Sequence, residues 1–174
     1  MITAEQIVYR FKSKFGDKIK DARIDTKEVA VKKNKYYVVW LRIDRDIFRD
    51  AVKELMEIQY PHLSVVSGND LGDTIELVYH FSVQYGESLT EIPINICVSV
   101  PKTDLKIPSI CDLIPGALIT EREKQDMFGV KIENIPDDRR IFVPEDFPEG
   151  IYPVSYTHLR AHETRHDLVC RLLL

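Results

Sequence analysis

The sequence predicts an α+β fold, a two-layer sandwich in which two helices cover a mostly antiparallel or mixed sheet. Two stretches in the first sixty residues carry apolar residues at helical spacing. Three later stretches alternate apolar and polar residues with the period of two that is typical of half-buried strands. After Pro101, prolines recur so often that we expect an extended C-terminal arm instead of further long elements.

The first helix is expected to begin after Thr3, because Gln6 follows three residues later and the two complete a capping box. Gly16-Asp17 is the natural end of this helix. Its apolar face at helical spacing comprises Ile7, Val8, Phe11 and Phe15.

Residues 18–32 alternate in polarity around Asp25-Thr26, which predicts two short strands joined by a turn there. Residues 36–42 are rich in aromatic and β-branched side chains and predict a strong strand, with Trp40 in core or interface. Asp44 is expected to cap a second helix that stops at Pro61. The apolar stripe of this helix is Ile47, Phe48, Ala51, Val52, Leu55 and Met56.

Three strands are expected over 63–68, 73–85 and 92–100, the last two joined by a hairpin at Gly86. Pro93 indicates that the third strand either lies at an edge or begins there. Their period of two predicts one buried and one largely polar face, with His80 on the polar one.

A charged block follows, in which residues 120–128 predict a short helix. Thr120 and Glu123 have the spacing of a second capping box, and Gly129 fits the position after the helix end. Arg122 and Asp126 are four residues apart, so an ion pair on one helix face is expected. A solvated helix with ordinary surface ion pairs is the simplest interpretation of these charges.

Large apolar residues in the block and in the arm favour docking over that interpretation. Met127 and Phe128 end the helix, and Phe142, Phe147 and Tyr152 lie in an arm without regular structure. Such an arm packs on its own domain or on a partner. We therefore expect a core domain over 1–118 and a docking segment over 119–153. The expected partner-binding residues are Glu121, Arg122, Glu123, Asp126, Phe128, Gly129, Arg139, Arg140, Pro144, Phe147 and Pro148.

Composition excludes several classes of protein. The net charge is −4 without a basic stripe, which argues against nucleic-acid binding. No apolar run is long enough to span a membrane, and the N-terminus lacks the pattern of a secretory signal. Cys97, Cys111 and Cys170 lie far apart without a C-x-x-C pair, so a zinc ribbon or iron–sulfur site is not expected. Reduced cysteines in a cytosolic protein are the simplest interpretation.

The charged block resembles the signature of the thirty-kilodalton subunit of respiratory complex I, the NADH:quinone oxidoreductase. The same domain occurs in energy-converting nickel–iron hydrogenases and formate hydrogenlyase. The resemblance is strong over about residues 75–153 and looser before that. The matching residues are Ser109, Asp112, Leu113, Pro115, Ala117, Glu121, Arg122, Glu123, Asp126, Met127, Phe128, Gly129, Val130, Pro136, Asp137, Arg139, Arg140, Pro144 and Gly150.

This resemblance implies a structural subunit without an active site, flavin, metal or cluster of its own, in an oxidoreductase or translocase complex. It implies that the chain packs on the large subunit carrying the quinone or nickel–iron site, near iron–sulfur subunits. The complex would be peripheral on the cytoplasmic face of the membrane, which the chain meets only indirectly. Many complex I members have Gly-His where this chain has Asn134-Ile135, and the arm resembles the hydrogenase branch. The parent complex therefore stays open, as does a free-standing interaction domain.

Residues 154–174 are a separate case. His162, Glu163 and His166 form an H-E-x-x-H pattern, which in zinc hydrolases binds the metal and supplies a base. Few residues follow for a third ligand, and no cleft is predicted. The segment instead resembles a translated sequencing-adapter read-through, so we expect a non-native tail and treat a zinc hydrolase as the remote alternative.

Overall fold

The structure of the protein is a computed structural model that describes residues 2–29, 34–86, 90–144, 148 and 150–154. The expected docking residue Phe147 and the tail motif from His162 to His166 lie outside these residues. The helices are α1 (Ala4–Phe15), α2 (Phe48–Ile58) and α3 (Ala117–Phe128). The strands are β1 (Ile19–Val29), β2 (Asn34–Ile43), β3 (His62–Asp70), β4 (Thr74–Val83), β5 (Ile92–Pro101), β6 (Lys106–Pro108) and β7 (Lys131–Glu133).

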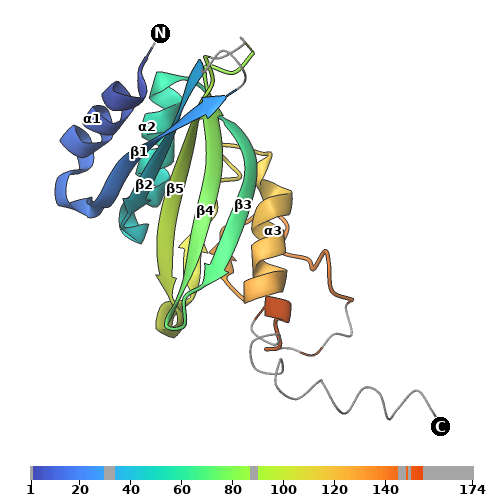
Figure 1. The fold of residues 1–174 in the computed structure, drawn as a ribbon. Coiled ribbons are helices and arrows are strands. Elements are labelled where there is room, and N and C mark those ends of the chain that lie inside the picture. Colours follow the sequence, from blue (N-terminus) through green and yellow to red (C-terminus); the bar gives the residue numbers. More distant parts are fainter. Residues whose placement is uncertain (1, 30–33, 87–89, 145–147, 149, 155–174) are drawn as a thin grey trace, which may run out of the picture.

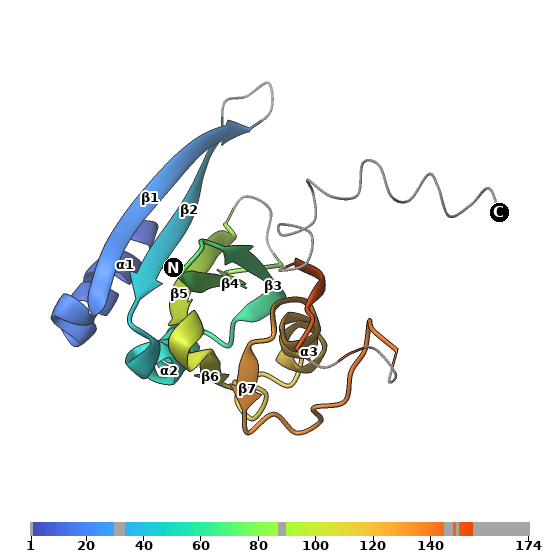
Figure 2. The same ribbon diagram turned by 90° about the horizontal axis from the view of Figure 1, so that it is seen from below.

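The main sheet is mixed and has the strand order β1-β2-β5-β4-β3. Strand β2 runs parallel to β5, and the other neighbours are antiparallel. The helices lie on one face of this sheet, with α1 and α2 behind β1 and β2 and α3 beside β3 (Figures 1 and 2). The fold is thus the expected α+β arrangement, and the short parallel pair β6–β7 lies on the helical side.

The third helix belongs to the same layer as the first two. Tyr79 on β4 packs its ring 4.5 Å from that of Phe48 on α2, measured between centroids, and its hydroxyl donates to Glu121 on α3. One hydrophobic cluster extends from Ala4 to Ile132. The expected domain division after residue 118 falls inside α3, where Ala117 and Phe128 are both buried.

Helix α1 agrees with its predicted start. Thr3 accepts a hydrogen bond from the Gln6 amide, and the Gln6 side chain accepts one from the Thr3 amide, so the capping box is formed. Ile7 and Phe11 are fully buried against the sheet. Where a cap and an apolar stripe coincide, the pattern places the helix and its buried face.

Two predictions about local structure were wrong. Residues 19–29 form one strand, β1, which runs through Asp25-Thr26 without a turn and pairs with β2. Asp44 lies before α2 but makes no side-chain cap; its carboxylate instead pairs with Lys20 at 2.9 Å. Pro93 follows the first residue of β5, an inner strand, so it marks a beginning and not an edge.

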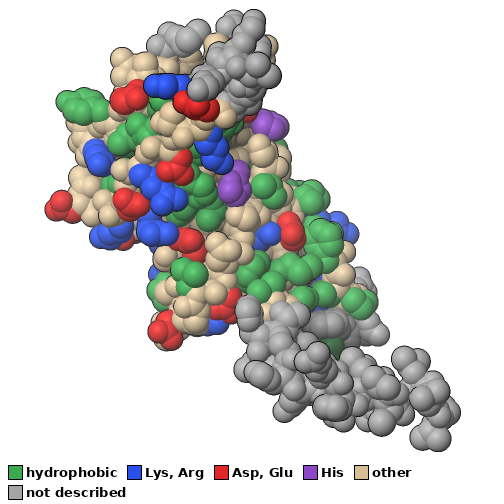
Figure 3. All heavy atoms as spheres, in the orientation of Figure 1, with side chains coloured by type: hydrophobic (Ala, Val, Ile, Leu, Met, Phe, Trp, Pro, Cys, Tyr) green, Lys and Arg blue, Asp and Glu red, His purple; other side chains and the backbone are tan. Residues whose placement is uncertain are grey.

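On the face of the sheet opposite the helices, charged side chains gather over the β1 side, and hydrophobic side chains lie between and beyond them (Figure 3). Arg42 pairs with Glu76 at 2.8 Å across β2 and β4. His80 lies on this face, as predicted, between the hydroxyl of Ser67 and the amide oxygen of Asn95, at 2.8 and 2.6 Å. Cys97 is nevertheless buried here, since the long neighbouring side chains cover the middle of the sheet.

Candidate docking site

The helix at the centre of the expected docking segment begins earlier than predicted. Its first residue is Ala117, and Gly116 precedes it without a side-chain cap. Thr120 is already inside the helix and donates its hydroxyl to the carbonyl of Ala117 at 3.1 Å. The expected capping box of Thr120 and Glu123 was therefore wrong, because a turn at residues 110–114 leads into the helix before Thr120 is reached.

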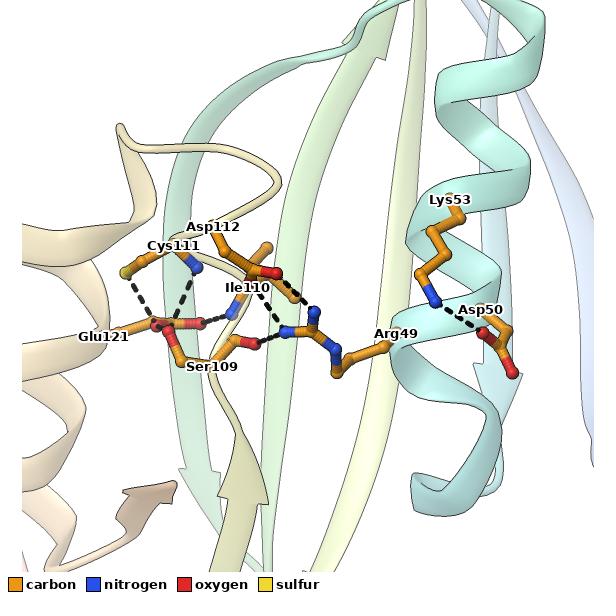
Figure 4. Close-up of polar contacts among 8 residues, drawn as sticks. All are labelled: Arg49, Asp50, Lys53, Ser109, Ile110, Cys111, Asp112 and Glu121. Atoms are coloured by element: carbon orange, nitrogen blue, oxygen red, sulfur yellow. Dashed lines mark hydrogen bonds and ion pairs between the residues drawn. The ribbon is translucent and has the colours of Figure 1, made fainter. Parts of the chain in front are cut away.

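Glu121 lies in the interior and not on a solvated helix face. Its carboxylate accepts hydrogen bonds from the hydroxyl of Ser109 at 2.6 Å and from the amide of Ile110 at 3.1 Å. The thiol of Cys111 lies at 3.2 Å and the hydroxyl of Tyr79 at 3.4 Å (Figure 4 shows the contacts to the 109–111 turn). A fully buried carboxylate is tolerable only with such donors.

Burial governs the acid–base behaviour of this cluster. It raises the pKa of Glu121 above its ordinary value, although the four donors act in the opposite direction. Burial also raises the pKa of Cys111 to about 12, and it raises that of Tyr79 well above its usual range. The thiol and the phenol therefore stay protonated at neutral pH and serve as donors to the carboxylate.

A neighbouring ion pair joins the same turn to α2. The Arg49 guanidinium donates to both carboxylate oxygens of Asp112, at 2.8 and 2.6 Å, and to the carbonyl of Ser109 (Figure 4). This arginine holds the pKa of Asp112 below its ordinary value. The turn at 109–112 is thus fixed from one side by α2 and from the other by α3.

Two charged residues of α3 bind residues 137–142, the start of the arm, which we call its root. The Arg122 guanidinium donates to the carbonyl of Arg139 at 2.7 Å and to the Asp137 carboxylate at 3.0 Å. The Asp126 carboxylate accepts from the amides of Ile141 and Phe142 at 2.7 and 2.9 Å. The expected pair of Arg122 with Asp126 was wrong, because each side chain bonds the arm instead of the other.

Two aromatic rings pack closely on glycines: one holds α3 against β3, and the other holds the end of the arm against the end of α3. A Cβ on Gly68 of β3 would lie 2.6 Å from a ring carbon of Phe128, so only glycine admits this ring. Gly129 has a left-handed φ of 73° and ends α3 as predicted, donating its amide to the carbonyl of Gln125. A Cβ there would lie 2.3 Å from the ring of Tyr152, which therefore closes the arm over the helix end.

The predicted docking residues thus fall into two groups. Glu121, Asp126 and Phe128 are buried and make contacts within the chain. Of the described remainder, Arg139 is exposed and its Nη2 pairs with Asp137 at 2.8 Å, while Arg140 lies 3.9 Å from Asp126. Pro144 and Pro148 are exposed. Glu123 pairs with Lys124 at 3.1 Å, and Arg122 is only partly exposed.

Two outward apolar residues accompany them: Phe142, which the sequence analysis singled out in the arm, and Ile119, which it missed. Phe142 is 54% exposed and Ile119 is 55% exposed. Ile119 directly precedes the charged block, and no sequence pattern marked it as exposed. The exposure of Phe142 follows from the way Asp126 holds the backbone amides of residues 141 and 142. Large apolar side chains held outward on a fixed backbone are typical of a protein-binding surface.

Within the described residues, no group of three or more His, Cys, Asp or Glu side chains is arranged to hold a metal ion. In the same part of the chain, no helix has the length and apolar character needed to cross a membrane.

Comparisons with known proteins point to one family. A profile of the family described as "Respiratory-chain NADH dehydrogenase, 30 Kd subunit" matches residues 41–161. The chain is 38% identical over 142 residues to the membrane-bound hydrogenase subunit beta of Pyrococcus furiosus, covering 80% of this chain and 81% of that protein. It is 29% identical to a subunit of the NADH-quinone oxidoreductase of Herpetosiphon aurantiacus, covering 68% of each. It is 36% identical to formate hydrogenlyase subunit 5 of Escherichia coli, covering 60% of this chain but 18% of that protein.

Solved structures share the fold. A chain of the membrane-bound sulfane sulfur reductase, an archaeal respiratory membrane complex, superimposes with a TM-score of 0.66 at 22% identity, covering 94% of both chains. A trypsin-resistant fragment of Nqo5 gives a TM-score of 0.51 at 20% identity, covering 66% of this chain and 89% of the fragment.

Proposed function

The chain belongs to the 30-kDa subunit family of respiratory-chain NADH dehydrogenase, and on this premise we propose that it is a structural subunit of a membrane-associated NADH:quinone oxidoreductase. In this role it holds no redox group and braces the large subunit that carries the quinone site. The observation that carries the proposal is the clamped arm: Arg122 and Asp126 fix its root while Phe142 stays 54% exposed.

In this proposal the clamped arm is the contribution that a subunit without a catalytic centre makes to the oxidoreductase. Hydrogen bonds from α3 set the path of the arm before a partner arrives, so little conformational entropy remains to be lost on docking. In this proposal Phe142, Arg139, Pro144 and Pro148 contact the large subunit. The buried residues Glu121, Asp126 and Phe128 position that surface from within.

The proposed place of the subunit is peripheral, on the cytoplasmic face of the membrane, next to the large subunit and its iron–sulfur neighbours. Its relatives include subunits named for NADH-quinone oxidoreductase and for membrane-bound hydrogenase. Contact with the lipid is indirect in this arrangement, through the integral subunits of the complex.

A second candidate parent complex is an energy-converting nickel–iron hydrogenase or a formate hydrogenlyase. The higher identity and the wider coverage of the archaeal hydrogenase subunit favour it. The role of the chain is the same in both, but the large subunit then carries a nickel–iron site. Mass spectrometry of the subunits that co-purify with the tagged chain distinguishes the two parents.

The test of the bracing role is a charge reversal at the arm root. Arg140 lies beside the buried Asp126, so Arg140→Glu places two like charges together and loosens the arm. We expect less of the large subunit to co-purify with tagged Arg140→Glu, while circular dichroism of the isolated chain stays unchanged.

Lys53→Glu is the matched control, because Lys53 forms an exposed pair with Asp50 on α2 (Figure 4). Helix α2 lies at the other end of the helical layer from the arm (Figure 1). Its recovery of the large subunit should equal that of the unmodified chain. Full assembly of Arg140→Glu would contradict the proposed role of the arm.

A further inference from the structure

Helix α3 and the arm that follows it carry an excess of acidic side chains. Residues 117–150 contain nine acidic and five basic side chains, a net charge of −4. The rest of the chain contains nineteen of each. An excess of one sign on a docking surface favours a partner surface of the opposite sign, so the placement of these charges bears on the partner.

Outside residues 117–150, the fold pairs acidic side chains with basic ones from other elements. Arg10 and Lys14 of α1 both pair with Glu54 of α2, and Arg42 of β2 pairs with Glu76 of β4. Further pairs of this kind are Lys18 with Asp46, Lys20 with Asp44, Arg45 with Asp104 and Arg49 with Asp112. These charges act chiefly on one another.

The basic side chains of α3 and the arm are also engaged within the chain. Arg122 and Arg139 both pair with Asp137, at 3.0 and 2.8 Å. Two further bases lie beside carboxylates of α3, Lys124 at 3.1 Å from Glu123 and Arg140 at 3.9 Å from Asp126. The side chain of Arg139 is 82% exposed, but Asp137 balances its charge. The adjacent arginines therefore do not make this surface basic.

Two carboxylates at the start of the arm make no ion pair with any other described residue. They belong to Glu133, the last residue of β7, and to the exposed Asp138. Both line a hollow of about 360 Å³, whose other lining residues are Gln125, Lys131, Ile132, Asn134 and Ile135. Lys131 brings one positive charge against these two negative ones, so the hollow has an acidic balance.

An aromatic ring lies a short way along the same stretch of backbone. Phe142 is 54% exposed, and Asp126 fixes its backbone amide at 2.9 Å. In Figure 2 this stretch leads from β7 away from the main sheet. A cationic side chain pairs with a carboxylate and also packs favourably over the face of an aromatic ring. Carboxylates and ring therefore favour the same kind of partner side chain.

We propose that the surface receiving the arm is basic, with lysine or arginine side chains of the large subunit facing Glu133, Asp138 and the ring of Phe142. The inference rests on the proposed function, because it names the chemistry of the large-subunit surface on which the arm docks. The arginines of the arm root set its path, and the acidic side chains supply the charge that the partner recognises.

Two neighbouring substitutions of opposite sign test this inference on the complex purified through a tag on this chain. Asp138→Asn removes a negative charge, and we expect about fivefold less of the large subunit to be recovered, as for the loss of one charge pair across an interface. Arg139→Gln removes the positive charge that balances Asp137 from outside, so recovery of the large subunit should rise.

Asp21→Asn is the matched control, because Asp21 is also exposed and lies on β1, at the opposite edge of the sheet from β3. It loses the same charge and should leave recovery of the large subunit unchanged. Circular dichroism of each isolated variant checks that it still folds.

Ionic strength provides a second readout on the same complexes. Salt shortens the range of charge interactions from about 10 Å at 0.1 M to about 3 Å at 1 M. Recovery of the large subunit with the unmodified chain should therefore fall as KCl is raised. The fall should be shallower for Asp138→Asn, which has lost part of the attraction.

The outcomes separate the two proposals. Recovery of the large subunit that is independent of both KCl and Asp138→Asn overturns the basic partner surface and leaves the bracing role intact. Recovery that falls with Arg139→Gln but not with Asp138→Asn also overturns it, because the partner surface is then acidic. Purification of the unmodified chain without any large subunit overturns both proposals.

Discussion

Helices α1 and α3 both cover one face of the same sheet, but they are held there by opposite chemistry. Helix α1 packs through Ile7 and Phe11 and buries no charged side chain of its own. Its partly exposed Arg10 and Lys14 pair with the buried Glu54 of α2. Helix α3 buries Glu121 and Asp126, with hydrogen bonds as their compensation. Apolar burial tolerates small shifts of a helix, whereas a buried carboxylate requires each hydrogen-bond donor in place. Fewer positions of α3 than of α1 are therefore compatible with the folded structure.

The first test of this difference between the helices is Phe11→Ala on α1. Phe11 is fully buried, so its removal leaves a cavity in the core, and we expect the free energy of unfolding to fall by about 3–5 kcal/mol. Urea unfolding measures this loss. Tyr9→Ala on the exposed side of the same helix should change stability by less than about 0.5 kcal/mol. An equal effect of both changes would refute the apolar account of α1.

The matching change on α3 is Glu121→Ala. It removes the acceptor of the Ser109, Cys111 and Tyr79 side chains, and each buried donor left unpaired costs about 1–3 kcal/mol. We expect a total loss of about 3 kcal/mol in the same urea titration. Glu123→Ala, two residues along, removes only a pair with Lys124 and should cost at most about 1 kcal/mol. If Glu121→Ala left the free energy of unfolding unchanged, the three donors would have to form hydrogen bonds with water instead.

These two helices also show what could be predicted from the sequence. The capping box of Thr3 and Gln6 and the apolar stripe of α1 are local patterns, and both were found. The partners of Glu121 are 12 and 42 residues away, at Ser109 and Tyr79, so no local pattern reveals them. The signature block was recognised as a unit, but its charges were placed on the surface because a charged helix is usually solvated.

The arm illustrates the same limit. Arg122 and Asp126 have the spacing of a helical ion pair, and only the path of the arm shows that each has a better partner. The extent of the pairing between β2 and β5 could not be predicted either, since residues 36–42 indicate one strand and nothing in them shows that this pairing begins at Val39. Sequence periodicity predicts which residues form a strand, and register depends on residues far away.

A smaller effect is expected where the Phe128 ring of α3 packs on Gly68 of β3. In Gly68→Ala, the new Cβ would lie 2.6 and 2.8 Å from carbons of the buried Phe128 ring, so the ring or the strand must shift. Overpacking of this kind costs about 1–3 kcal/mol. Gly116→Ala is the control, because a Cβ there meets no atom within 4 Å and should leave thermal unfolding unchanged. A stable Gly68→Ala protein would show that α3 is seated loosely.

The smallest expected effect is on the pH dependence of stability. The pKa of Glu121 is raised in the folded protein, so the folded state holds its proton more tightly than the unfolded state does. Its contribution is therefore most favourable below the unfolded pKa and is lost as pH rises through the folded pKa. Glu121→Gln does not titrate, so the difference in stability between it and the unmodified chain should shift in favour of the variant with rising pH. A difference that is independent of pH would contradict the raised pKa.

The packing of the Tyr152 ring on Gly129 limits the conformations that the arm can adopt. Because the chain leaves α3 at Gly129 and returns to the same point, the arm is a closed loop and not a tail. Closing a loop restricts its conformations in advance, and the cost grows only slowly with its length. Insertions into this loop should therefore alter its reach far more than the stability of the fold, so the loop can vary in length as a partner surface varies.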